Sequence, residues 1–95
     1  MPAARDAAIR IRKDVVFRDL EGEMVLLNLA TGVYFGLDPV GTRIWALIDD
    51  GRSVDQIVAA ITAEYEVDAD VCRVDLERFV ATLRDNDLVD LDAGR

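Results

Sequence analysis

The sequence predicts an α+β domain, a small winged-helix-like fold in which a three-stranded antiparallel sheet is followed by three helices. Two apolar runs, residues 24–29 and 33–37, flank Ala30-Thr31-Gly32, where Gly32 can adopt the positive φ of a tight hairpin turn. An alternating run at residues 15–18 adds a further strand. From Asp38 onward, three segments have helical periodicity and begin at capping residues. The chain of 95 residues is long enough for one such domain, residues 1–95.

The N-terminal part of the chain is expected to supply the first strand. Ile9-Arg10-Ile11-Arg12 alternates, and after Lys13-Asp14 the run Val15-Val16-Phe17-Arg18 predicts a strand with one buried face. Residues 19–23 predict a turn into the strand at 24–29. Residues 1–7 lack an anchoring pattern and are expected to be flexible, whereas residues 88–91 predict a closing strand or an extended tail.

The strand at residues 33–37 is predicted to form an unprotected sheet edge. It contains no charge, no proline and no lysine, the features that usually prevent an edge from pairing with another chain. Because side chains alternate along a strand, Val33, Phe35 and Leu37 face one side, and Tyr34 and Gly36 face the other. We therefore expect this edge to accept a partner strand.

The first two helices have clear start signals. Asp38-Pro39 caps the first helix, which Gly51 ends. One stripe of that helix comprises Val40, Ile44, Leu47 and Ile48, with Trp45 on its flank. Ser53 and Gln56 form a capping box that opens the second helix. The apolar face of the second helix comprises Val54, Ile57, Val58, Ile61 and Tyr65.

The third helix is predicted from an Asp68 or Asp70 cap to about Asn86 and has two distinct faces. Its core stripe comprises Cys72, Leu76, Phe79 and Leu83. A second band beside it mixes apolar and charged side chains, namely Val71, Val74, Asp75, Arg78 and Thr82. Such a band, next to the core but not part of it, is suited to line a groove.

Charge and composition disfavour several function classes. The net charge is −8, with +3 on residues 1–18 and −11 on residues 19–95. An acidic body repels phosphate backbones and anionic lipids, so neither nucleic acid nor a membrane is an expected partner. No apolar run is long enough to span a bilayer, and a cytoplasmic location is expected. The single cysteine excludes an intrachain disulfide.

Catalytic and cofactor chemistry also finds little support. The chain has no histidine, one serine and one cysteine, so the usual pairs of nucleophile and base cannot be assembled. Ser53 is explained as a helix cap rather than as a phosphopantetheine attachment site, and Cys72 as a buried thiol. The acids at 68–77 lack the glycine of a calcium loop. No enzyme activity, metal or cofactor is expected.

Several of these residues together resemble the PqqD-like leader-recognition domains, or RiPP recognition elements, of ribosomal peptide pathways. The resemblance extends from about residue 15 to residue 91 and is most similar to the stand-alone form from lasso-peptide clusters. It is carried by Leu27-Asn28, Thr31-Gly32, Tyr34, Leu37, Gly41, Ile44-Trp45 and Asp75. The leucine-proline-glutamate stretch of the pyrroloquinoline-quinone branch is replaced here by Leu29-Ala30-Thr31, which favours the lasso branch.

The resemblance implies a non-catalytic adaptor that binds the leader of a precursor peptide as an added antiparallel strand on the third strand, beside the third helix. The implied peptide-binding residues are Val33, Tyr34, Phe35 and Gly36 on the strand and Val71, Val74, Asp75, Arg78 and Thr82 on the helix. The implied partners are the precursor peptide, a transglutaminase-like leader peptidase and an ATP-dependent lactam synthetase.

Two other functions and two assembly states stay open at this point. A general protein-interaction module could also use the open edge. A winged-helix regulator fits the order of elements, although the third helix and its caps carry a net charge of −3. The exposed edge allows either a monomer or an edge-paired dimer.

Overall fold

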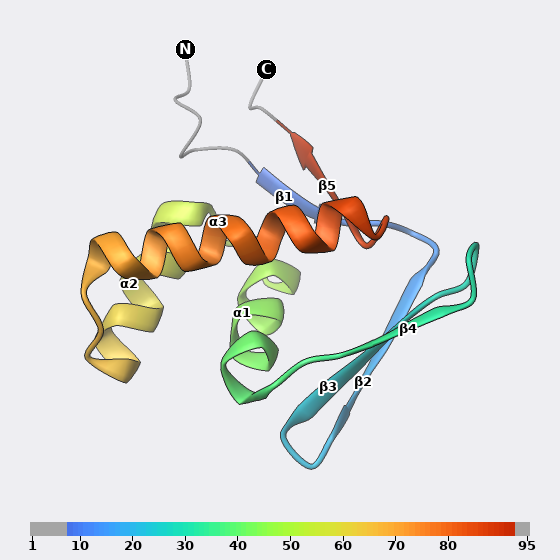
Figure 1. The fold of residues 1–95 in the computed structure, drawn as a ribbon, viewed down its shortest axis with the longest axis horizontal. Helices are drawn as coiled ribbons and strands as arrows, with labels where there is room; N and C mark the ends of the chain where they lie inside the picture. Colours follow the sequence, from blue (N-terminus) through green and yellow to red (C-terminus); the bar gives the residue numbers. More distant parts are fainter. Residues whose placement is uncertain (1–7, 93–95) are drawn as a thin grey trace.

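The computed structural model describes residues 8–92, so the flexibility predicted for residues 1–7 concerns a segment outside the described residues. Figure 1 shows the three-stranded sheet at one end of the molecule, α2 at the other and α1 between them, with α3 running across. In chain order, the elements are β1 (Ala8–Ile11), β2 (Val15–Leu20), β3 (Glu23–Asn28), β4 (Val33–Gly36), α1 (Pro39–Asp49), α2 (Val54–Tyr65), α3 (Ala69–Asp85) and β5 (Val89–Asp92). The predicted α+β class and the three-stranded antiparallel sheet followed by three helices are confirmed.

The meander has the order β2-β3-β4, joined by two tight turns. In the first turn Glu21 and Gly22 both have positive φ, at 57° and 88°, as a two-residue hairpin turn of this hand requires. In the second turn Gly32 has φ 76° and donates its N–H to the Asn28 carbonyl at 2.7 Å. The hairpin predicted around Gly32 is therefore present, and its register pairs Leu26 with Phe35.

Asn28 is a buried polar side chain that fixes the β3–β4 turn in the core. It is 1% exposed, and its Oδ1 accepts hydrogen bonds from the N–H groups of Ala30 at 2.8 Å and Thr31 at 3.3 Å. Its Nδ2 donates to the Asp87 carbonyl at 2.9 Å. The amide thus satisfies both of its polar ends and links the turn after β3 to the turn between α3 and β5.

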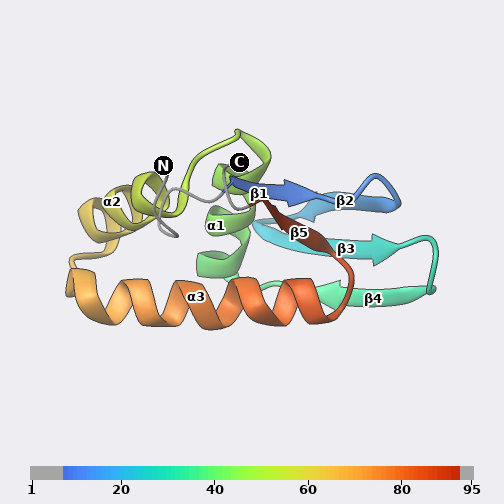
Figure 2. The ribbon, with the colours of Figure 1, turned by 90° about the horizontal axis from the view of Figure 1, so that it is seen from above.

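A second, two-stranded sheet joins the N-terminal and C-terminal parts of the described chain. The alternating run at residues 9–12 does not continue into the meander; β1 pairs with β5, with Ile9 opposite Leu91. The closing strand predicted at residues 88–91 is present, whereas its pairing with β1 was not predicted. Arg12 supports this pairing through a 3.1 Å ion pair with Asp90. Figure 2 shows the pair lying beside α1.

The β2 strand differs from the prediction of one buried face. Val15 is buried, but the rest of the strand is exposed, including Phe17 at 37%. The Phe17 ring meets the Trp45 ring edge-on, with centroids 5.4 Å apart and an interplanar angle of 77°. Trp45, predicted on the flank of its helix, is fully buried at the centre of the core.

The three helices start where their capping residues predict. Asp38 caps α1, Ser53 and Gln56 form both hydrogen bonds of a capping box on α2, and Asp68 caps α3. The buried hydrophobic side chains of the helices are Ile44, Trp45, Leu47 and Ile48 of α1, Ile57, Val58 and Ile61 of α2, and Cys72, Leu76, Val80 and Leu83 of α3. Val40 and Tyr65, predicted on core stripes, are instead 39% and 41% exposed.

Candidate functional site

The outer side of β4 is an open sheet edge. Among the described residues β4 pairs with β3 alone. The Leu37 N–H donates to the Met24 carbonyl at 2.8 Å, and hydrogen-bonded pairs alternate along an antiparallel ladder. The main-chain groups of Phe35 therefore point toward β3, whereas those of Tyr34 and Gly36 point away from the sheet. Two N–H and two C=O groups are left for a further strand.

The side chains of β4 divide as the sequence predicts. Phe35 lies opposite the fully buried Leu26 and packs against the core, and Leu37 is 5% exposed. Tyr34 lies on the opposite face and is 69% exposed. The inner side chains anchor the strand, so its open edge is held in a fixed position next to the helices.

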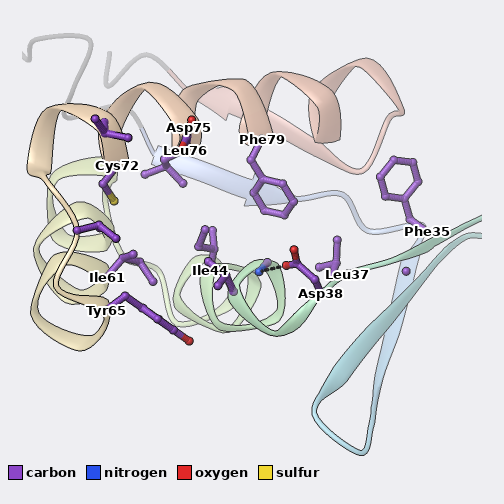
Figure 3. Close-up of a pocket in the computed structure, with 15 residues that line it drawn as sticks. Phe35, Leu37, Asp38, Ile44, Ile61, Tyr65, Cys72, Asp75, Leu76 and Phe79 are labelled. Atoms are coloured by element: carbon purple, nitrogen blue, oxygen red, sulfur yellow. Dashed lines mark hydrogen bonds between the residues drawn. The ribbon is translucent and has the colours of Figure 1, made fainter.

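A groove of about 550 Å³ begins where β4 ends, and Figure 3 shows it between α1 and α3. Its walls come from two stretches of the chain, residues 35–44 and residues 61–79. The lining residues are Phe35 and Gly36 of β4, Leu37 and Asp38 after it, Val40, Gly41 and Ile44 of α1, Ile61 and Tyr65 of α2, Val67 of the connector, and Val71, Cys72, Asp75, Leu76 and Phe79 of α3. Most of these side chains are apolar, which suits a peptide with apolar anchors.

Local hydrogen bonds at the start of α1 set the floor of the groove. The Asp38 carboxylate accepts the Gly41 N–H at 2.7 Å, a contact drawn in Figure 3. The Thr42 hydroxyl accepts the Met24 N–H at 2.8 Å and donates to the Leu37 carbonyl at 3.3 Å, which ties α1 to β3 and to the end of β4. These contacts hold the end of the open edge against the groove.

Gly41 gives the groove its depth at this point. A Cβ placed there would lie 3.1 Å from Asp38 Oδ1 and 3.5 Å from the Phe79 ring. Any larger residue would therefore push on the N-terminal cap of α1 or on the α3 wall. The absence of a side chain keeps the Phe79 ring available as part of the groove surface.

The groove carries negative charge on both sides and no positive charge. Asp38 and Asp75 line it, and none of its lining residues is a lysine, arginine or histidine. Burial raises the pKa of the Cys72 thiol, and the negative charge of Asp75 raises it further, against the opposite effect of Arg73. The thiol therefore stays protonated at neutral pH and behaves as part of the apolar wall.

Arg43, the basic residue of α1, does not line the groove and is paired with an acidic residue of α2. Arg43 binds Glu64 of α2 in a bidentate contact, with its Nε 3.0 Å from Oε1 and its Nη2 2.8 Å from Oε2. This pair raises the pKa of Arg43 and lowers the pKa of Glu64, chiefly through the hydrogen bonds between them. It joins α1 to the end of α2 that carries Tyr65.

The structure brings together part of the predicted site. Phe35 and Gly36 of β4 and Val71 and Asp75 of α3 line the groove. The other predicted residues are exposed but do not line it, namely Val33 and Tyr34 on β4 and Val74, Arg78 and Thr82 on α3. On a helical wheel Val71 and Asp75 adjoin the core stripe, whereas Val74 lies farther from it.

Sequence reasoning missed three exposed apolar residues of the groove, Val40, Tyr65 and Val67. Val40 and Tyr65 match the periodicity of their helices, so the pattern placed them in the core. Their positions, at the first and last turns, were the available signal, because a helix end can extend beyond the elements that cover its middle. Val67 lies in the connector after α2, where periodicity does not apply.

The described residues contain no cluster of histidine, cysteine or acidic side chains that could hold a metal ion. Within residues 8–92, no helix is both long and apolar enough to cross a membrane.

Comparisons with known proteins identify the family of the chain. A family model described as coenzyme PQQ synthesis protein D (PqqD) matches residues 23–89. A solved structure described as TbiB1 in complex with the TbiA(beta) leader peptide is 44% identical, with a TM-score of 0.84, and the match covers 85% of this chain and 94% of that chain. A search of curated proteins gave no match.

A second solved structure, described as lasso peptide synthetase B1 complexed with the leader peptide, has a TM-score of 0.82. It is 26% identical, and the match covers 87% of this chain and 98% of that chain. Both similar structures therefore extend over nearly the same length as the chain itself, and both hold a leader peptide.

Proposed function

The chain belongs to the PqqD family, and from this membership we propose that it is a non-catalytic adaptor that binds the leader segment of a ribosomally made precursor peptide. The observation that carries the proposal is the open β4 edge, which ends at an apolar groove. The similarity to TbiB1, whose structure includes a leader peptide, supports the same conclusion. The proposed pathway is lasso-peptide biosynthesis.

In the proposed complex the leader adds an antiparallel strand to β4. The N–H and C=O groups of Tyr34 and Gly36 then form about four main-chain hydrogen bonds, each contributing ~1 kcal/mol. Apolar leader side chains enter the groove between α1 and α3, and two buried anchors contribute ~1.5 to 3 kcal/mol each. Ordering a flexible leader costs ~2 to 5 kcal/mol, and association also costs translational and rotational freedom, so both the strand pairing and the anchors are needed for stable binding.

The antiparallel direction also orients the rest of the precursor. Because β4 runs from Val33 to Gly36 and then into the groove, a leader of opposite direction has its N-terminal part over the groove. Its C-terminal end leaves near the β3–β4 turn at Gly32. We propose that the transglutaminase-like leader peptidase, and afterwards the ATP-dependent lactam synthetase, receive the peptide from that end.

Amide hydrogen exchange with and without a synthetic leader peptide tests the proposal. In the free protein the Phe35 amide should be protected by β3, and the amides of Tyr34 and Gly36 should exchange quickly. Leader binding should slow the exchange of Tyr34 and Gly36 specifically, since these groups point outward. Protection that appeared instead on β1 or β2 would show that the peptide uses the other edge.

A further inference from the structure

The charge of the groove suggests which leader side chains it binds, and main-chain strand pairing alone does not specify this. The residues that line it include two acidic side chains, Asp38 and Asp75, and no basic one. A peptide that enters the groove displaces water from around these carboxylates. The affinity of a purely apolar leader would therefore be lowered by the desolvation of an unpaired carboxylate.

Asp75 is the carboxylate without an internal partner. No hydrogen bond or ion pair joins it to any of residues 8–92, including Arg78, which follows three positions later on α3. Asp38 differs, because its Oδ1 already accepts the Gly41 N–H. Asp75 is exposed in the free protein, so water solvates it until a peptide covers the groove.

Neighbouring cations do not neutralise the groove from behind. Arg43 is held by Glu64 in the bidentate pair, and Arg73 contacts Asp55 of α2 at 2.6 Å. The negative charge of Asp75 also reaches the groove wall, since it contributes to the raised pKa of the Cys72 thiol. The groove is thus electrostatically complementary to a positive side chain.

Resting on the proposed leader-binding function, we propose that this protein recognises leaders with a lysine or arginine on the N-terminal side of the residues that pair with β4, and that Asp75 binds this cation. The N-terminal side follows from the antiparallel direction, which places that part of the leader over the groove. Asp75 is then a specificity-determining residue. It selects among peptides that share the same apolar anchors.

The test is a selection from a random linear-peptide library displayed on phage, with the wild-type protein and with the Asp75→Asn variant as baits. Peptides selected by the wild type should be enriched in lysine or arginine at a fixed distance N-terminal to their apolar anchors. Asp75→Asn should remove that enrichment and retain the anchors. Glu77→Gln is the matched control, because it changes the charge equally on the same helix and Glu77 does not line the groove.

Synthetic versions of the selected peptides give the quantitative test. Replacing the basic residue with glutamine should weaken binding to the wild type about two- to fivefold, as a partly exposed ion pair predicts, and should leave binding to Asp75→Asn unchanged. Asp75→Lys should bind better when the peptide residue is changed to glutamate. Equal effects in the wild type and Asp75→Asn would overturn the inference.

The two proposals fail in different ways. Selected peptides that protect the Tyr34 and Gly36 amides but show no basic preference would overturn the role of Asp75 alone. Selected peptides that leave both amides unprotected would overturn strand addition on β4, and the inference would fall with it.

Discussion

Val71 and Val74 lie within one turn of each other on α3, and both side chains are about half exposed, at 56% and 47%. Val71 lines the groove, whereas Val74 does not. An exposed valine adds little to the stability of the free domain, but a valine covered by a bound peptide contributes apolar contact. Substitutions at the two positions can therefore distinguish binding in the groove from binding on the exposed face of α3 that carries Val74.

We expect Val71→Asn to weaken leader binding by ~1 to 3 kcal/mol, because the amide would be buried under the peptide without a partner. Val74→Asn is the matched control and should have a smaller effect, since Val74 lies outside the groove. Titration of a labelled leader peptide measures both affinities. Each variant should melt within about 3 °C of the wild type, and a larger loss of stability for Val71→Asn would mean that the residue supports the core instead.

At the scale of elements, β4 combines a firmly packed inner face with an unprotected outer edge. The Phe35 ring packs against the core, and the Thr42 hydroxyl fixes the residue that follows the strand through the Leu37 carbonyl. A strand held in this way loses little conformational freedom when a peptide pairs with it. The open edge is thus preorganised for strand addition, although no side chain marks it as a binding site.

Proline substitutions can test the two sides of β4 separately. Tyr34→Pro removes an N–H that points outward, so the domain should fold while leader affinity falls about five- to tenfold from the lost main-chain hydrogen bond. Phe35→Pro removes an N–H that points toward β3, and it should strongly lower the melting temperature. Melting curves and leader titrations measure the contrast. An unchanged affinity for a folded Tyr34→Pro variant would contradict pairing at Tyr34.

At the scale of the whole molecule, the acidic charge disfavours nucleic acid as a partner. The net charge is −8, and the part of the chain from residue 19 onward carries −11. Part of the N-terminal positive charge is on Arg12, which directly follows β1 and is paired with Asp90. The proposed site combines main-chain pairing and apolar contact with a single ion pair at Asp75, so most of its affinity does not depend on long-range attraction.

Leader affinity should therefore change little with ionic strength. Between low and moderate salt we expect a decrease smaller than the about two- to fivefold effect of removing the basic residue, because screening weakens one partly exposed ion pair and leaves the strand pairing intact. Fluorescence anisotropy over a salt series measures this dependence. A steep linear loss in log affinity would indicate several phosphate-type contacts and would support the winged-helix regulator instead.

The sequence by itself determined the features that depend on neighbouring residues. Gly32 supplies the positive φ of the β3–β4 turn, Asp38 and Ser53 cap their helices with their own side chains, and the run after Gly32 has no charge or proline to protect it at a sheet edge. Each of these follows from contacts within a few residues. For the same reason the sequence pointed to β4 as the location of the proposed site.

Only the tertiary structure decided which surfaces cover one another. The pairing of β1 with β5 joins residues about 80 positions apart, as in Ile9 with Leu91, and the alternating pattern of either strand fits any partner. Periodicity placed Val40 and Tyr65 on core stripes, yet no element covers those helix ends, and they line the groove. Burial depends on what packs against a residue, and the residue pattern of one segment does not specify which other segments pack against it.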